Sequence, residues 1–597
     1  GTLENDTTYY WRIVVSDGKV ANPQSDVWSF TTEAVPDPAP TVVAVTIPSN
    51  SSSPFRIEFS EYISNTNVSG AFSFSPEVSG TWNWSNGNTI AEFTPDGGWL
   101  PGSYNKFVLV GNVLEDATGK LLESSMEKKF DVPAEIEVPA GYHSYSFPMK
   151  LAANQTVSIT VPDLKYGKSC YVVAIADGNA VNPSGRASLS LNPNGLNDSY
   201  QDPTYALRLE EANMISNPIV VPKSNSALRS VISPAEIGTE RTFYLNNIAT
   251  TTAYPNNKFR ATLAKMSGTT MVYLDNAITD GNRDSVAQNV LNTFDNNIVQ
   301  QVREAFGNEP EFGVDGESRI TIVLVKLGES TTTAGYYYSG DLYSSTYYKE
   351  SNEGKIFYIK YGMEDSTTFG TLAHEFQHMI NYYQKNKTLA YNAQSINEET
   401  WLNEALSKYS EEVCGYSIKD GDYNTTSLVK LSMVNNKYLS LTNWGPNTLH
   451  CYGQVYLFMH FLAYPGRYNS DSANITRALV TGNGSALTGE ANVEAVTGEP
   501  FRLTMAKYAL SLCLNNHSSN SPTAYAINNI DLKGTYNGLS LPGYTIDNIS
   551  NPVSLSDMPY KNSVRFFKKT AGGSGNVSFS ITAGTQPATL WLFDERE

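Results

Sequence analysis

The stretch that most constrains this chain is TLAHEFQHMINYY, Thr371 to Tyr383. Its apolar residues recur at helical spacing over a broad face, which predicts an α-helix buried against other elements. The same helix carries His374, Glu375 and His378, although burying such groups is costly unless they have partners. A fold that contains this helix must therefore supply partners for three polar side chains.

The spacing of these three residues is typical of a metal site. His374 and His378 are four residues apart, so their imidazoles lie on one face of a helix, about one turn apart. Two nitrogens so placed can reach one zinc ion, and Glu375 is close enough to hold a water on it. The chain has only six histidines, so chance seldom produces this HExxH pattern. We interpret the stretch as a zinc-binding helix.

A second predicted helix supplies a third ligand. Catalytic zinc takes three protein ligands and leaves one position for water. No third histidine follows at the HExxHxxGxxH spacing, so a carboxylate on a later helix is expected. The helix predicted from Asn397 to Val413, NEETWLNEALSKYSEEV, contains Glu404, with 25 residues between it and His378. Glu404 is the best candidate.

These two helices carry a family resemblance. HEFQH followed by WLNEALSKY resembles the gluzincin (glutamate-zincin) peptidases, whose carboxylate ligand lies in an Asn-Glu-Ala/Gly word. The longer run FGTLAHEFQHMINY … TWLNEALSKYSE, with AGYYYSGDLY upstream, is most similar to the hyicolysin-type secreted metallopeptidases. The resemblance implies that His374, His378 and Glu404 bind one catalytic zinc and that Glu375 is the general base of an endopeptidase.

This chain lacks the residue that orients a zinc-binding histidine in thermolysin-like enzymes. Thermolysin-like enzymes carry a supporting Asp four residues after the glutamate ligand, where this chain has Lys408. Ligand imidazoles need a hydrogen-bond partner to orient them, so another residue must supply it. Glu399, Glu411 and Glu412 are the candidates, although each is also typical of a solvated helix face.

The residue that stabilises the oxyanion stays open between two candidates. His450 stands three residues before Gly453, the slot of a catalytic Tyr in related aminopeptidases, and Tyr452 is the alternative. Both belong to the stretch Asn447 to Tyr464, whose second half is predicted as a helix. An ordinary capping or packing role is the alternative for each residue.

The whole chain predicts a multidomain protein, because 597 residues exceed one core. Residues 1–33 resemble the last strands of a fibronectin type III domain, and residues 41–132 resemble a bacterial Ig-like β-sandwich. Residues 133–237 are β-rich with no assigned role. Residues 238–540 are expected to form an α+β zincin-type metallopeptidase domain. Residues 541–597 are expected to form a C-terminal β domain that stops within a strand.

Two elements of the expected peptidase domain matter for the site. Asp284 to Phe306 has the apolar period of a helix. The strand predicted from Lys355 to Tyr361 closely precedes the histidine helix. We hypothesise that this strand is the sheet edge on which an extended substrate pairs.

The composition of the chain indicates which partners and which cellular location to expect. A net charge of −18 argues against nucleic acid and anionic membrane surfaces as partners. No apolar run approaches the roughly 20 residues of a transmembrane helix.

The first residues read as the middle of a β-domain, so we expect a signal peptide to precede them and the protein to act outside the cell or at its surface. Protein or peptide substrates are expected, with extracellular or cell-surface ligands for the β-modules. The four scattered cysteines read as buried small residues.

Three features of the sequence allow other interpretations. Gly362 to Asp365, GMED, is similar to the amine-binding word of aminopeptidases, but it lies too close to the histidine helix. A surface adhesin with a decayed peptidase domain is the alternative outside the enzymes, and the intact base and ligands argue against it. Asp280-Gly281-Asn282-Arg283-Asp284 spaces oxygens like part of a Ca²⁺ loop, but a turn with a helix cap explains it better.

Overall fold

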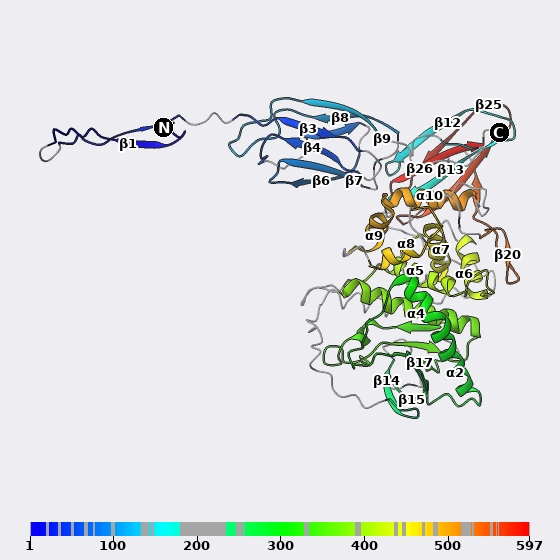
Figure 1. Ribbon diagram of the computed structural model, residues 1–597. Helices are drawn as coiled ribbons and strands as arrows, with labels where there is room; N and C mark the ends of the chain where they lie inside the picture. Colours follow the sequence, from blue (N-terminus) through cyan, green and yellow to red (C-terminus); the bar gives the residue numbers. More distant parts are fainter. Residues whose placement is uncertain are drawn as a thin grey trace. The chain divides into compact units, whose positions relative to one another are not determined.

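The computed structural model describes residues 2–48, 53–132, 142–178, 235–327, 333–387, 396–514 and 530–595, apart from short gaps within these ranges. The chain divides into two compact units, Gly1–Pro133 and Ala134–Glu597. Strands make up the first unit, and the second combines helices with sheets (Figure 1). The expected change from all-β to mixed structure is confirmed at this level.

The first unit contains a hairpin and two facing sheets. β1 (Thr8–Trp11) and β2 (Trp28–Thr31) pair antiparallel. The two sheets have the strand orders β3-β4-β7-β6 and β5-β8-β9. Their strands are β3 Val42–Thr46, β4 Phe55–Phe59, β5 Phe72–Ser75, β6 Gly80–Ser85, β7 Ile90–Pro95, β8 Gly102–Leu109 and β9 Met126–Val132. Alternate residues of β4 are buried, and Phe55 and Phe107 meet from opposite sheets in one aromatic core.

Two segments far apart in sequence share the sheets of a β domain in the second unit. β13 pairs with β24 and β26, and β12 pairs with β25. The strands are β10 Tyr142–Ser144, β11 Met149–Leu151, β12 Thr156–Leu164, β13 Ser169–Ala176, β22 Ile546–Asn548, β23 Val553–Ser554, β24 Val564–Thr570, β25 Gly575–Thr582 and β26 Ala588–Glu595. Residues 133–237 and 541–597 were expected to belong to separate domains, but the described strands of both segments form this one domain. Residues 179–234 lie outside the described part.

A six-stranded sheet lies in the part of the second unit that was expected to be α+β, in the order β14-β15-β16-β17-β19-β18. The strands are β14 Glu240–Tyr244, β15 Lys258–Met266, β16 Thr270–Asp275, β17 Ile320–Val325, β18 Gly335–Tyr337 and β19 Ile356–Lys360. β19 pairs with β17 on one side and β18 on the other. The hypothesis that β19 is the edge strand is therefore wrong, because the short strand β18 folds back beside it and takes the edge position.

Helices cover one face of this sheet. The predicted helix at residues 284–306 is confirmed as α2 (Arg283–Thr293), a π-helical turn (Phe294–Ile298) and α3 (Val299–Phe306). The predicted histidine helix is confirmed within α4 (Asp365–Asn386), which packs with α2 and α3 on the sheet.

The further helices are α5 Thr400–Val413, α6 Tyr423–Val434, α7 Leu449–Leu462, α8 Ser472–Thr481, α9 Gly489–Thr497 and α10 Phe501–Leu514. α4 and α5 lie at the centre of this unit (Figure 1). The four cysteines are buried and form no disulfide. Among the described helices, none has the length and apolar character that a membrane span requires.

Candidate metal centre

The centre is built on α4, whose middle is buried on nearly every side. His374 and His378 are one turn apart, and their ring centroids are 4.9 Å apart. Glu375 is buried beside them and 4% exposed. The apolar residues around these side chains anchor α4 between the sheet and the later helices, so the two imidazoles face α5.

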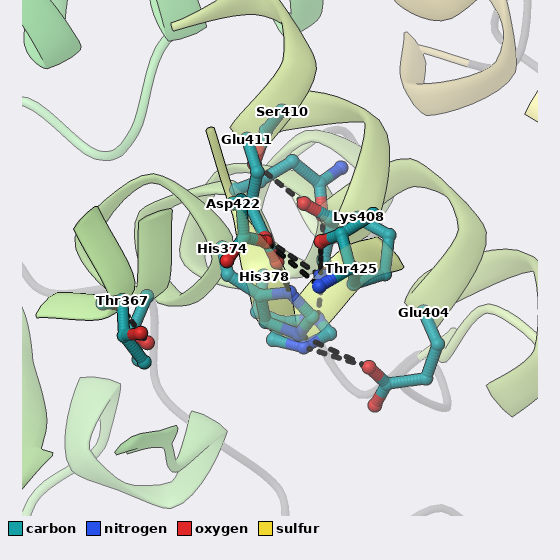
Figure 2. A network of polar contacts seen from close by, with 12 residues as sticks. Thr367, His374, His378, Glu404, Lys408, Ser410, Glu411, Asp422 and Thr425 are labelled. Carbon is teal, nitrogen blue, oxygen red and sulfur yellow. Dashed lines mark hydrogen bonds and ion pairs between the residues drawn. The ribbon is translucent and has the colours of Figure 1, made fainter. Parts of the chain in front are cut away.

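Glu404 reaches the histidines from the first half of α5. Its Oε2 is 3.1 Å from Nε2 of His374 and 3.7 Å from Nε2 of His378. Figure 2 shows the three side chains converging from the two helices. Among the described residues, these are the only three His, Cys, Asp or Glu side chains whose ligand atoms all lie within 4.8 Å of one another.

His374 is oriented by a charged network. Oε1 of Glu411 lies 2.8 Å from Nδ1 of His374, and Nζ of Lys408 donates to the other oxygen of Glu411 at 2.7 Å. Lys408 also donates to Oγ1 of Thr425 at 2.9 Å, and Asp422 caps α6 by accepting the backbone N–H of Thr425 (Figure 2). The lysine that breaks the expected pattern thus neutralises the carboxylate that supports the histidine.

His378 is oriented by neutral groups instead. Its Nδ1 lies 3.1 Å from Oδ1 of Asn403 and 3.0 Å from Oγ of Ser407. Asn403 Oδ1 also accepts from Nδ2 of Asn381 at 2.7 Å, which identifies it as an acceptor. The Nδ1–H of His378 therefore donates to Asn403, and Nε2 is the nitrogen that faces Glu404.

The electrostatics of the group favour a positive charge at its centre. Burial lowers the pKa of His374, but hydrogen bonds to Glu404 and Glu411 outweigh burial and raise this pKa to about 10. Burial raises the pKa of Glu404, but His378 and His374 hold it well below its usual value. Two nitrogens and one carboxylate oxygen are also the donor set that zinc takes in catalytic sites. The residues therefore fit a zinc ion.

The two candidates for stabilising the oxyanion, His450 and Tyr452, differ in their position relative to the centre. Tyr452 lies on α7 with its ring centroid 6.5 Å from that of His374. His450 belongs to the first turn of α7 but not to the convergent group. Residues that are two positions apart on a helix are rotated by about 200° around its axis. The side chains of His450 and Tyr452 therefore do not face the same way. This geometry favours Tyr452 as the group near the centre.

The three glutamates that were candidates for orienting a histidine have different partners in the structure. Of these, Glu411 reaches a ligand histidine. Glu412 instead faces the buried His460, with Oε2 3.3 Å from its Nε2, and accepts from the hydroxyl of Tyr456 at 2.6 Å. Glu399 accepts the indole N–H of Trp401 at 2.7 Å. Asn403, Ser407 and Thr425 could not be identified from the sequence, because residues of these types are common on helices without any role at a site.

Two weaker motifs lie outside the centre. Asp365 begins α4 nine residues before His374, about 13 Å along the helix axis, so the GMED word is separate from the ligand group. Residues 280–284 are exposed and form the expected turn, in which the N–H of Arg283 donates to the carbonyl of Asp280.

Part of the chain is similar to a metalloprotease. No protein-family model matches the chain. Neutral metalloprotease ShpI of Staphylococcus hyicus is 28% identical over 289 residues, which is 46% of this chain and 61% of that protein. The chain thus matches less than two thirds of that relative's length.

Solved structures contribute no further argument. The surface layer protein SbsC, domains 1–6, aligns with a TM-score of 0.14 and 15% identity over 21% of each chain. The LD transpeptidase LdtMt1 aligns with a TM-score of 0.12 and 10% identity, over 22% of this chain and 64% of that one. Scores this low do not bear on the fold of this chain.

Proposed function

We propose that the second unit is a zinc-dependent endopeptidase of the gluzincin type, related to the hyicolysin-type enzymes. His374, His378 and Glu404 would hold the zinc. The observation that carries this proposal is the convergence of their ligand atoms within 4.8 Å, with the far nitrogen of each imidazole hydrogen-bonded to α5. The metalloprotease relative supports the same class of enzyme.

When bound, zinc supplies Lewis acidity that lowers the pKa of a water and polarises the substrate carbonyl. Glu375 accepts the proton of the attacking water and delivers it to the leaving amine. The hydroxyl of Tyr452 donates a hydrogen bond to the oxyanion that develops on the carbonyl. Glu411 and Asn403 keep the imidazoles of His374 and His378 in the ligand orientation.

The substrate is placed by the sheet edge. β18 is the edge strand, and it lies directly on α4, because a Cβ on Gly335 would come 2.6 Å from Cγ2 of Thr371. An extended peptide can add to β18 through main-chain hydrogen bonds, which would hold the scissile bond beside His374 and His378. An endopeptidase needs this kind of binding, since it recognises chain on both sides of the cleaved bond.

We also propose an extracellular or cell-surface location. The first unit is all β, and residues 41–132 resemble modules of bacterial surface proteins. In this arrangement the β-modules bind extracellular or cell-surface ligands while the second unit cleaves proteins.

The test is metal content by mass spectrometry, measured together with casein hydrolysis with and without a chelator. Wild-type protein should hold one zinc and lose activity with chelator, and Glu404→Ala should lose both zinc and activity. Folded wild-type protein that takes up no zinc, even when zinc is added, would reject the proposal and favour a binding protein with a decayed site. Cleavage of peptides with a free but not a blocked amine would indicate an aminopeptidase.

A further inference from the structure

A cavity of about 410 Å³ opens beside the metal centre. We call it the Glu399 pocket; its lining includes Tyr337, His378, Asn381, Glu399, Asn403 and Trp444. It therefore joins a proposed zinc ligand, the edge strand β18 and the start of α5. Pockets of this volume typically accommodate a small ligand or a large side chain.

The charges around the pocket have one sign. Its lining contains Glu398 and Glu399, and the described lining residues include no Lys or Arg. Glu398 is already neutralised, because Nζ of Lys385 lies 2.9 Å from its Oε2. In the described part of the chain, Glu399 forms no ion pair and accepts one hydrogen bond, from Trp401. Lys561 pairs with Glu490 and also lowers the pKa of Glu399. The three carboxylates Glu398, Glu399 and Glu490 thus meet two lysines, which leaves one net negative charge beside the pocket.

Glu399 is also held in place. Gly489, which has a φ of 56°, lies so close that a Cβ there would come 2.1 Å from the carboxyl carbon of Glu399. Burial, together with the charges of Glu398 and Glu490, raises the pKa of Glu399. A neighbouring positive charge would relieve the repulsion between these carboxylates.

Buried polar atoms in the lining point to the same ligand. Asn381 is 2% exposed, and its Nδ2 donates to Asn403. Its Oδ1 has no hydrogen-bond partner among the described residues, and neither does the indole N–H of Trp444. Buried polar atoms normally have partners. Glu399 thus offers a carboxylate at the pocket, and the residues that line it also hold one acceptor and one N–H without partners in the described part of the chain.

We propose that the Glu399 pocket is a specificity subsite that receives a lysine or arginine side chain next to the cleaved bond. The inference rests on the proposed endopeptidase function. Ammonium and guanidinium groups carry only donors, which suits Glu399 and Asn381 Oδ1. Trp444 would donate to a main-chain carbonyl of the bound peptide, and the shared residue His378 places this pocket within one residue of the scissile bond.

Internally quenched peptides test this subsite. The peptides differ at the two residues that flank the cleaved bond, which are Arg, Lys, Gln, Leu or Glu, and mass spectrometry of the products identifies the cleaved bond. Wild-type kcat/KM should be about tenfold higher for Arg and Lys than for Gln at one of the two positions, the size of a hydrogen bond to a charged group. Glu should be the poorest residue there.

Variants assign the preference to Glu399. Glu399→Gln keeps an oxygen for the Trp401 N–H, so it should remove the preference for Arg over Gln while leaving zinc content unchanged. Glu399→Lys should invert the order and favour Glu. Glu304→Gln is the matched control, because Glu304 is exposed on α3 and pairs with Gln300; it should leave the preference intact.

The outcomes separate the two proposals. A zinc-loaded protein that cleaves casein but shows no cationic preference overturns the subsite, and so does a Glu399→Gln variant that keeps the wild-type ratio. If Glu399→Gln loses zinc, the wild-type peptide series alone decides. A zinc-loaded protein that cleaves neither casein nor any peptide defeats the endopeptidase, and the subsite with it.

Discussion

Glu411 and Glu412 are neighbours on α5, and each pairs with a buried histidine. Glu411 contacts His374 and is balanced by Lys408, whereas Glu412 contacts His460 together with the hydroxyl of Tyr456. The first pair belongs to a group in which a second histidine and Glu404 converge. The second pair joins α5 to α7, and Nζ of Lys419 lies 3.6 Å from the other oxygen of Glu412. Among the described residues, no further His, Cys, Asp or Glu completes a metal group there.

The comparison shows that a carboxylate–histidine pair is not in itself a site. His374 is held by one nitrogen while the other faces the group of Glu404 and His378, which is the arrangement that the proposed zinc site requires. His460 is fully buried with its ring 4.5 Å from that of Tyr456, and its contact with Glu412 lies inside a helix interface, outside the group of convergent ligand atoms. We therefore expect mutations of Glu411 and Glu412 to have different effects.

The largest effect should come from Glu375→Gln, which leaves the ligands and both carboxylate–histidine pairs in place. Loss of the general base should lower kcat/KM for a protein substrate by about 10²–10⁴-fold with zinc content unchanged. Glu364→Gln is the control, because Glu364 is an exposed residue just before α4. A fully active Glu375→Gln protein would remove Glu375 from the mechanism.

Glu411→Gln should weaken zinc binding by about 10–100-fold, the usual cost of losing the partner of a ligand imidazole. The measurement is competition for zinc against a chelator of known affinity. The double variant Glu411→Gln/Lys408→Met distinguishes loss of this orientation from the cost of an unpaired buried lysine. Unchanged zinc affinity in both variants would make the Glu411 pair equivalent to the Glu412 pair.

Glu412→Gln should leave zinc affinity unchanged and lower the free energy of unfolding by about 1–2 kcal/mol. Burial raises the pKa of Glu412, but His460 and Tyr456 outweigh it and hold the pKa far below the ordinary value of 4.5. A depressed pKa stabilises the fold above the unfolded pKa, and this stabilisation is lost as the pH falls. Urea unfolding should show the difference between wild type and variant shrinking below about pH 4.5. A difference that grows on acidification would contradict the pairing.

The smallest effect should come from Thr425→Val, which removes one hydrogen bond to Lys408 and keeps the side-chain shape. A hydrogen bond to a charged group contributes about 1.5–3 kcal/mol to stability. Thr425 acts on His374 only through Lys408 and Glu411, so zinc affinity should fall severalfold at most. The same chelator competition measures it. A loss as large as that of Glu411→Gln would show that Lys408, and not Glu411, controls the orientation of His374.

Local spacing explains why part of the site could be predicted. His374, Glu375 and His378 lie within five residues, and a helix brings them together whatever the rest of the chain does. The need for a third donor then led to Glu404 on the next suitable helix. The choice among Glu399, Glu411 and Glu412 could not be made, because it depends on how α5 is rotated against α4.

Contacts between distant segments could not be predicted. Strand β18 takes the sheet edge from β19, and β13 pairs with β24 and β26, roughly 400 residues further on. The alternation of apolar residues along a strand indicates which of its faces is buried. It does not indicate which other strand pairs with it. In the same way, Thr425 and Tyr452 approach the centre from α6 and α7 only once those helices are packed.

The order of residues alone settled the helix that carries the metal group and the kind of donors it offers, because both follow from side-chain chemistry and a 3.6-residue period. The packing of α4 against α5 decided which carboxylate orients His374 and that Lys408 neutralises it. The cavity around Glu399 likewise exists only where α4, α5 and β18 meet. Hydrogen bonds act over about 3 Å, so partners from separate helices and strands are assigned only when tertiary packing brings them within that distance.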